Sequence, residues 1–188
     1  METVGPQRAT RAVGALAVVA ALVWVLDQVT KLLAVRALRA HEQVEVVGEV
    51  LSLRLVRNPG AAFGLAGGMT VVFSLVAVAV AVAVVRVARN VRSTGWALAL
   101  GLLLGGAVGN LTDRLFRSPG PLRGHVVDFL ELPHWPVFNV ADMAIVAASA
   151  LMVLLSARGI GLDGSRVVGG RPARGTPVAG RDASDDHG

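Results

Sequence analysis

The chain lacks cysteine entirely and has few charged or aromatic residues. Of its 188 residues, 16% are charged and 4% are aromatic, whereas soluble domains contain about 25% charged residues. Without cysteine, a thiol nucleophile, a disulfide framework, a lipidated cysteine and a thiolate metal site are all excluded. The 18 basic residues exceed the 13 acidic ones, for a net charge of +5. Because the arginines are scattered and aromatics are scarce, this excess does not indicate a nucleic-acid-binding protein.

Apolar residues dominate what is present. They make up 54% of the chain, and the mean hydropathy is +0.63, more apolar surface than a soluble domain of this size can bury. Four apolar stretches have about the length that a helix needs to cross a bilayer: residues 12–35, 67–85, 96–112 and 137–156. The second alternates Val and Ala as a strand would, but an open strand cannot satisfy its backbone in lipid. We therefore predict an all-α membrane protein, a bundle of four transmembrane helices in one domain.

The ends of the chain and its shortest loop suggest a domain boundary and an orientation. The first stretch resembles a secretory signal peptide, but no small-residue cleavage site follows it, so we expect a retained anchor. Residues 1–157 form the predicted membrane domain, and residues 158–188, rich in Gly, Arg, Asp, Ser and Pro, are expected to lack packed structure. The 86–95 loop carries three arginines and no acid, which predicts that it and both termini are cytoplasmic.

Two longer segments then lie outside the cell, residues 36–66 and 113–136. In the first, Leu51, Leu53 and Leu55 alternate with polar residues, a strand signal that predicts a small extracytoplasmic β element. Two tryptophans near span ends, Trp96 and Trp135, are expected in the interfacial belts.

Polar residues converge on one face of the predicted bundle. Consecutive spans alternate in direction, so the end of the first, the start of the second, the end of the third and the start of the fourth share one face. At these ends lie Asp27, Lys31, Asn58, Asn110, Asp113, Arg114, Asp128, Asn139 and Asp142. Within each span the polar residues are three or four apart and so share a side of the helix. Ionisable groups at membrane depth cost ~2.5–3.5 kcal/mol each and normally face a bundle interior or an aqueous cavity, which predicts a polar site here.

Several of these sets also have a purely structural interpretation. Asp27 and Lys31, four residues apart, form a self-neutralising ion pair on one helix. Asp113 and Arg114 suit a helix cap and an interfacial anchor, and Arg114 is expected to pair with Asp113 and hold the third helix end in place. Asn58, followed by Pro and Gly, is by itself only a turn.

The remaining candidates are two aspartates and two histidines. Asp128 and Asp142 form the best functional pair, because one follows an apolar membrane-adjacent run and the other lies one turn into a span. His125 and His134 are potential metal ligands near Asp128, but they lack a shared helical face and a typical ligand spacing. A metal-dependent membrane hydrolase or lipid transferase built on these four residues stays open as an alternative.

Five motifs together resemble the lipoprotein signal peptidase (signal peptidase II) family. They are D-Q-V-T-K (27–31), R-N-P-G-A-A-F (57–63), G-N-L-T-D-R (109–114), V-V-D-F (126–129) and F-N-V-A-D (138–142). They occur in the family's order and cover residues 27–142. The resemblance implies an aspartic endopeptidase of the bacterial cytoplasmic membrane, with its active site near the extracytoplasmic face and no cofactor or metal. It would cleave signal peptides from diacylglyceryl-modified prolipoproteins just before the lipidated cysteine of the lipobox, and would be inhibited by globomycin.

The resemblance also assigns residues. The catalytic pair falls on Asp128 and Asp142. Positions that support the site or the substrate fall on Asp27, Lys31, Asn58, Asn110, Asp113, Arg114, Asn139 and Ala141. Prolipoproteins and membrane lipids are the implied partners, and no oligomer is implied. A proton shared between two close carboxyls suits peptide hydrolysis by activated water.

Two further function classes are less consistent with the sequence. A proton-coupled transporter predicts charges near the bilayer midplane and internal symmetry, whereas here the charges gather at one face and no repeat is found. A purely structural four-helix scaffold would not need carboxylates and asparagines at four converging helix ends.

Overall fold

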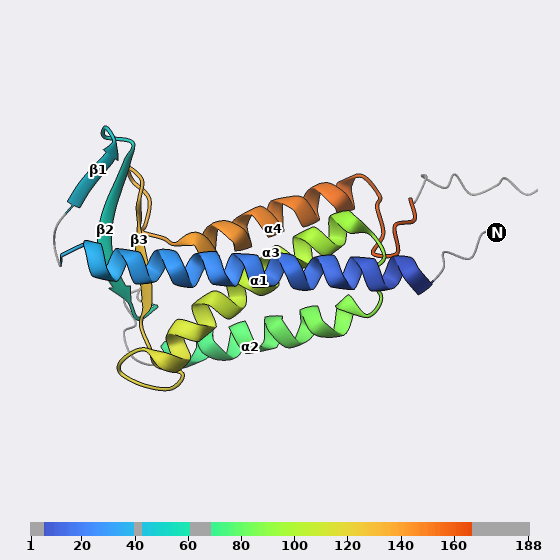
Figure 1. Cartoon of the computed structure of the whole chain (residues 1–188), viewed down its shortest axis with the longest axis horizontal. Coiled ribbons are helices and arrows are strands. Elements are labelled where there is room, and N and C mark those ends of the chain that lie inside the picture. Colours follow the sequence, from blue (N-terminus) through green and yellow to red (C-terminus); the bar gives the residue numbers. More distant parts are fainter. Residues whose placement is uncertain (1–5, 40–42, 61–68, 167–188) are drawn as a thin grey trace, which may run out of the picture.

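The computed structural model of the chain describes residues 6–39, 43–60 and 69–166. Their elements are α1 (Pro6–Ala37), β1 (Gln43–Val47), β2 (Leu51–Asn58), α2 (Met69–Ala88), α3 (Thr94–Phe116), β3 (Val126–Glu131) and α4 (Val140–Ala157) (Figure 1). All four helices are long and apolar enough to cross a membrane. The predicted four-helix membrane fold with a small β element is confirmed, and the Val/Ala alternation of α2 is helical.

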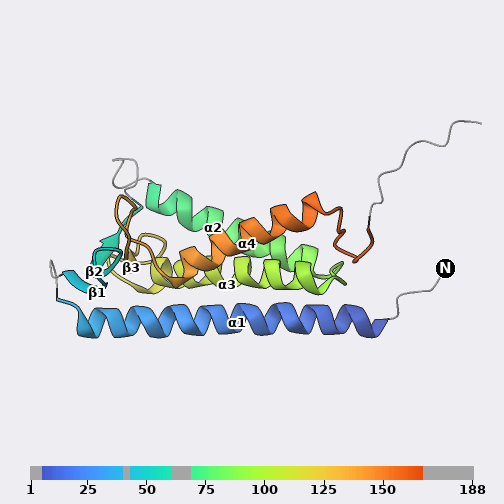
Figure 2. The same ribbon diagram turned by 90° about the horizontal axis from the view of Figure 1, so that it is seen from above.

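The helices run alternately up and down, with the small sheet at one end of the bundle (Figures 1 and 2). Helix α3 is central, since it packs against α1, α2 and α4. The sheet lies where α1 and α3 end and where α2 and α4 begin (Figure 1). The four helix ends that carry the polar residues therefore do meet at one end.

Glycines of α3 allow this central position. A Cβ on Gly101 would lie 2.8 Å from the Leu16 carbonyl oxygen of α1, and one on Gly105 would lie 2.7 Å from that of Ala20. On the other side of α3, a Cβ on Gly106 would lie 2.5 Å from the backbone oxygen of Ala141 in α4. Small residues let helix backbones approach closely in lipid, where packing replaces the hydrophobic effect as the driving force.

The sheet is antiparallel, in the order β1-β2-β3. Strand β2 includes the predicted Leu51–Leu55 alternation and continues to Asn58, and it pairs Val56 with Asp128 of β3. Buried Val127 and Phe129 of β3 pack against the last turns of α1, and this cluster fixes the sheet to the bundle. Strand β3, formed by the V-V-D-F motif, was not predicted.

Other boundaries also differ from those expected. Helix α2 continues to Ala88 and α3 to Phe116, because backbone hydrogen bonds continue beyond the apolar run. Residues 158–166, expected to lack packed structure, instead fold back on the start of α3. The carbonyl oxygen of Leu162 accepts hydrogen bonds from the backbone N–H of Arg92 (2.9 Å) and Ser93 (3.0 Å). Trp96, expected in an interfacial belt, donates from Nε1 to the Ile160 oxygen at 2.8 Å. The rest of the predicted tail lies outside the described residues.

Candidate active site

The first turn of α4 brings Asp142 to the sheet end of the bundle. Asn139 caps this helix with its side-chain Oδ1, which accepts the backbone N–H of Asp142 at 2.9 Å. In return, Asp142 Oδ2 accepts the backbone N–H of Asn139 at 3.2 Å. This reciprocal capping box uses two otherwise unpaired groups of the helix end and fixes the Asp142 carboxyl in the first turn.

Asp128 reaches the same place from β3. Its side chain is 2% exposed, and its Oδ1 accepts a hydrogen bond from Asn139 Nδ2 at 2.6 Å. Its Oδ2 accepts another from Asn58 Nδ2 at 2.9 Å. Because Asn139 contacts both Asp128 and Asp142, one side chain links the two predicted catalytic carboxyls.

The Asn58 amide is held in a fixed orientation. Its Oδ1 accepts the backbone N–H of Gly60 at 2.7 Å, which directs Nδ2 toward Asp128. Gly60 adopts φ +94°, and a Cβ there would lie 2.8 Å from the ring of Phe73. Only glycine combines this backbone conformation with so close an approach. The turn at residues 58–60, which by itself predicts no function, thus orients the Asn58 amide that donates to Asp128.

Asn110 completes the set of amides from α3. Its Nδ2 donates to Asp142 Oδ1 at 2.8 Å, and its Oδ1 accepts from Asn139 Nδ2 at 3.2 Å and Lys31 Nζ at 3.0 Å. Asp128 therefore accepts hydrogen bonds from the side chains of Asn58 and Asn139. Asp142 accepts them from the Asn110 side chain and the Asn139 backbone, so both carboxyls have little rotational freedom.

The electrostatic environment of Asp128 favours its protonated form. Burial raises the pKa of this carboxyl to about 6, and the nearby charge of Asp142 adds to the effect. The hydrogen bonds from Asn58 and Asn139 lower the pKa and offset part of this rise. A carboxyl with this pKa binds a proton more readily than an ordinary aspartate.

A buried ion network lies beside the carboxyls. Lys31, the only lysine of the chain, is fully buried, and its Nζ lies 2.8 Å from Asp27 Oδ2 and 2.9 Å from Asp113 Oδ2. Asp113 also pairs with Arg117, one turn further along α3. The predicted Asp27–Lys31 pair is present, but it belongs to a four-residue network that joins α1 to α3.

The two aspartates of this network each hold the backbone next to a predicted catalytic residue. Asp27 Oδ1 accepts the N–H of Ala141 at 2.9 Å, the residue before Asp142. Asp113 Oδ2 accepts the N–H of Val127 at 3.1 Å, the residue before Asp128. Lys31 bridges the two aspartates, so a single ammonium group links the supports of both carboxyl-bearing segments.

Arg114 differs from the expectation that it pairs with Asp113. Neighbouring residues on a helix do not face each other, and Asp113 turns instead to Lys31 and Arg117. Arg114 lies over the Phe73 ring, 5.6 Å from its centroid, and is 8% exposed. Among the described residues its buried Nη1 has no hydrogen-bond partner. With Asn110 it borders a cavity of about 270 Å³ between α2, α3 and α4, so a charged donor faces an otherwise apolar cleft.

Known proteins resemble this chain over the same region. Residues 19–158 match the family described as Signal peptidase (SPase) II. The chain belongs to the signal peptidase II family. It is 54% identical to a lipoprotein signal peptidase of Rhodococcus jostii, over 79% of this chain and 75% of that protein. It is 49% identical to one of Streptomyces coelicolor, over 84% and 78%.

Two solved structures share the fold. Both are bacterial membrane enzymes determined by the in meso method, at 2.3 and 1.9 Å resolution, and each superposes with a TM-score of 0.68. The first is 27% identical and covers 77% of this chain and 88% of its own; the second is 28% identical and covers 76% and 92%. The family resemblance drawn from the five motifs is thus confirmed, and the chain is a peptidase by family.

Apart from Arg114, the residues predicted from those motifs form one network of hydrogen bonds and ion pairs, which Ala141 joins through its backbone N–H. Every predicted site residue is described; Ala61, Ala62 and Phe63 of the second motif lie outside the described residues. The described residues contain no group of His, Asp and Glu that could hold a metal ion, so His125 and His134 do not join Asp128 in such a group. The site residues missed were Arg117, Phe73 and Gln28, whose Nε2 donates to Asp27 Oδ2 at 3.0 Å. Of these, only Arg117 had a sequence signal, its i,i+4 spacing from Asp113.

Proposed function

We propose that the chain is an aspartic endopeptidase that removes signal peptides from diacylglyceryl-modified prolipoproteins, cleaving just before the lipidated cysteine of the lipobox. The observation that carries this proposal is the shared contact of Asn139 with Asp128 and Asp142. It joins two acidic side chains, one buried and one in a helix cap, at the end of a membrane bundle. The relatives named lipoprotein signal peptidase support the choice of substrate.

In the proposed reaction, Asp142 is the ionised partner and Asp128 carries the proton. The N-terminus of α4 favours negative charge on Asp142, and burial raises the pKa of Asp128 to about 6. Asp142 takes a proton from a water molecule, whose oxygen attacks the scissile carbonyl carbon. Asp128 donates its proton to the carbonyl oxygen, which gives a tetrahedral gem-diol. As the C–N bond breaks, Asp142 passes the proton taken from water to the leaving amine, and Asp128 recovers its proton from a gem-diol hydroxyl.

The other predicted site residues support this pair. Asn58, Asn110 and Asn139 orient the carboxyls through the hydrogen bonds described above. Asp27, Lys31 and Asp113 are positioning residues, because they act on the backbone of Ala141 and Val127 and not on the substrate. Ala141 contributes its N–H and its small size, since its Cβ would lie 3.2 Å from one built on Gly109 of α3.

Arg114 and the cleft that it borders with Asn110 are suited to the substrate. The cleft is largely apolar along α2 and α3, with Arg114 and Asn110 at the end nearest the carboxyls. We assign the free Nη1 of Arg114 to a substrate carbonyl, because a buried unpaired donor is costly unless a ligand satisfies it. The scissile segment lies extended beside β2, and its acyl chains contact apolar helix faces exposed to lipid.

The proposed location is the bacterial cytoplasmic membrane, with the carboxyl pair near the extracytoplasmic face. The loop between α2 and α3 is at the end of the bundle opposite the sheet (Figure 1). By the positive-inside rule, the basic residues of this loop support a cytoplasmic location for the loop and for both termini.

The experiment incubates detergent-purified protein with a diacylglyceryl-modified prolipoprotein and follows the mature-size product on a gel. Wild type, Asp128→Asn and Asp142→Asn are compared, each with and without EDTA and with globomycin added to wild type. Asp163→Asn serves as the matched control, because it makes the same change at a fully exposed carboxyl remote from the site.

Wild type and the control variant should cleave with or without EDTA, and globomycin should block cleavage by wild type. Both dyad variants should lose all detectable turnover while eluting as folded protein in size-exclusion chromatography. Turnover retained by either folded dyad variant refutes the aspartic mechanism, and loss of wild-type activity in EDTA indicates a metal-dependent hydrolase instead.

A further inference from the structure

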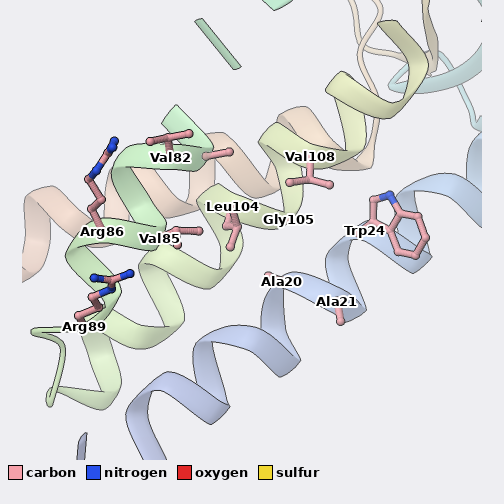
Figure 3. A pocket seen from close by; sticks show the side chains of 11 residues that line it. Ala20, Ala21, Trp24, Val82, Val85, Arg86, Arg89, Leu104, Gly105 and Val108 are labelled. Carbon is pink, nitrogen blue, oxygen red and sulfur yellow. The ribbon is translucent and has the colours of Figure 1, made fainter. Parts of the chain in front are cut away.

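A large cavity of the described structure is remote from the carboxyl pair. It measures about 670 Å³, within the ~300–1,000 Å³ typical of ligand sites. It lies between α1 and α2, with α3 as its floor (Figure 3). The lining residues are Ala20, Ala21, Trp24, Ala81, Val82, Val85, Arg86, Arg89, Leu104, Gly105 and Val108.

The cavity is an apolar trough with basic side chains at one end. Trp24 and Val108 lie toward one end, and Arg86 and Arg89 toward the other (Figure 3). Arg86 lies in the last turn of α2 and Arg89 directly follows that helix, and both side chains are exposed. Neither forms an ion pair with any residue that the structure describes. An apolar trough therefore ends at two cations that the described protein does not neutralise.

The dimensions of the trough match one leaflet of a bilayer. From Ala81 to its last residue, Ala88, helix α2 rises about 10 Å, and the Arg89 side chain lies beyond that end. Half of a hydrocarbon core is about 15 Å. Because α2 begins at the sheet and ends at the opposite end of the bundle (Figure 1), this is the leaflet remote from Asp128 and Asp142. Arg86 and Arg89 then lie where the headgroups of that leaflet begin.

We propose that this cavity binds one anionic phospholipid, with an acyl chain in the trough and its phosphate held by Arg86 and Arg89. Arginine forks match phosphate geometry, and basic residues at a membrane surface attract anionic lipids. Arg11 and Arg92, which line a second cavity at the same end of the bundle, add to the positive field there.

A signal peptide fits this cavity poorly. Its own N-terminal region is positively charged and would face Arg86 and Arg89 at the same membrane surface. Its helix also needs more than one leaflet, whereas the trough ends near mid-membrane. The lipid site is consequently independent of the proposed peptidase site, and its test does not depend on cleavage.

Native mass spectrometry of the full chain, released from detergent micelles, tests the proposal. Phosphatidylglycerol and phosphatidylcholine of the same acyl composition are titrated separately. We expect wild type to retain one phosphatidylglycerol more tightly than phosphatidylcholine. Arg86→Gln/Arg89→Gln should raise the Kd for phosphatidylglycerol about 25-fold, that is, about fivefold for each charge removed, and should abolish the preference between the lipids.

Two further variants separate a built site from general surface charge. Arg158→Gln/Arg166→Gln removes the same charge from exposed arginines outside the trough and should change the Kd less than threefold. Ala21→Trp fills the trough from a lipid-exposed position and should displace the lipid, whereas Val153→Trp on the exposed face of α4 should not. Equal binding of the two lipids by wild type, equal weakening by both arginine pairs, or unchanged binding in Ala21→Trp overturns the proposal.

Discussion

Replacement of Lys31 by Met is the most informative perturbation of the ion network. The side chain is fully buried, and Met retains its approximate length and apolar stem while removing the ammonium group. The change leaves the carboxylates of Asp27 and Asp113 within the bundle with only Arg117 as a counter-charge. Asn110 also loses the 3.0 Å hydrogen bond from Nζ.

The expected destabilisation is large because the remaining charges stay buried. Removing one partner of a buried ion pair costs about 3–5 kcal/mol, which for a chain of this size lowers Tm by about 6–20 °C. Cleavage should fall at least tenfold even below Tm, since the supports of Ala141 and Val127 are no longer held together. Removing an exposed partner costs about 0–1 kcal/mol, so Arg54→Met, which breaks the half-exposed pair with Glu131, is the matched control.

A double variant distinguishes lost charge balance from lost packing. Lys31→Met/Asp27→Asn removes one positive and one negative charge, leaves Asp113 paired with Arg117, and retains a side-chain oxygen to accept the Ala141 N–H. We expect it to regain most of the lost unfolding free energy, measured by denaturant titration of the detergent-solubilised protein. The reasoning is refuted if Lys31→Met loses less than about 1 kcal/mol, or if the double variant is no more stable than the single one.

Two further predictions concern the carboxyl pair and its packing. The pKa of Asp128 is raised to about 6, and the proposed role of Asp128 needs its proton. We therefore expect kcat/KM for prolipoprotein cleavage to fall as pH rises through an apparent pKa near 6. A kcat/KM that instead increases over this range would assign Asp128 as the base. Gly109→Ala places a Cβ 2.6 Å from Asp27 Oδ2. It should therefore lower the unfolding free energy by about 1–3 kcal/mol and reduce cleavage. The control is Gly14→Ala, whose Cβ meets no atom within 4 Å; it should leave the unfolding free energy unchanged or raise it, and should leave cleavage unchanged.

The convergence of polar residues was predictable from the sequence because a membrane constrains topology. Spans must alternate in direction, so polar residues at alternate ends of successive apolar stretches share a face without any knowledge of packing. Regular 3.6-residue periodicity then groups Asn110 with Asp113 and Asn139 with Asp142. The structure has this arrangement, with the Asn139 and Asn110 amides between the segments.

The partners of individual charges were less predictable. Asp113 was expected to pair with the adjacent Arg114, but helix geometry turns these side chains apart, and the i+4 residue Arg117 takes the place. Strand β3 was missed because its apolar run is short and its pairing with β2 is a long-range contact that periodicity does not encode. Hydropathy predicts that the second and third spans end at residues 85 and 112, because it falls at Arg86 and Asp113. The helices α2 and α3 continue to Ala88 and Phe116, because their backbone hydrogen bonds continue.

The arrangement of the ion network explains why a membrane protein retains three buried charges, Asp27, Lys31 and Asp113, in a region where each is costly. The network as a whole contributes little net stability, since buried ion pairs often do no better than apolar side chains in the same place. Apolar residues cannot accept hydrogen bonds from main-chain N–H groups. Asp27 and Asp113 do so, for the N–H groups of Ala141 and Val127 respectively. Those N–H groups come from β3 and from the start of α4, two segments that also meet through the Asn139 side chain and through backbone hydrogen bonds between Leu130 and Phe138. The network is thus better explained by the geometry of the carboxyl pair than by stability, and this is why substitutions in it should affect cleavage beyond their effect on folding.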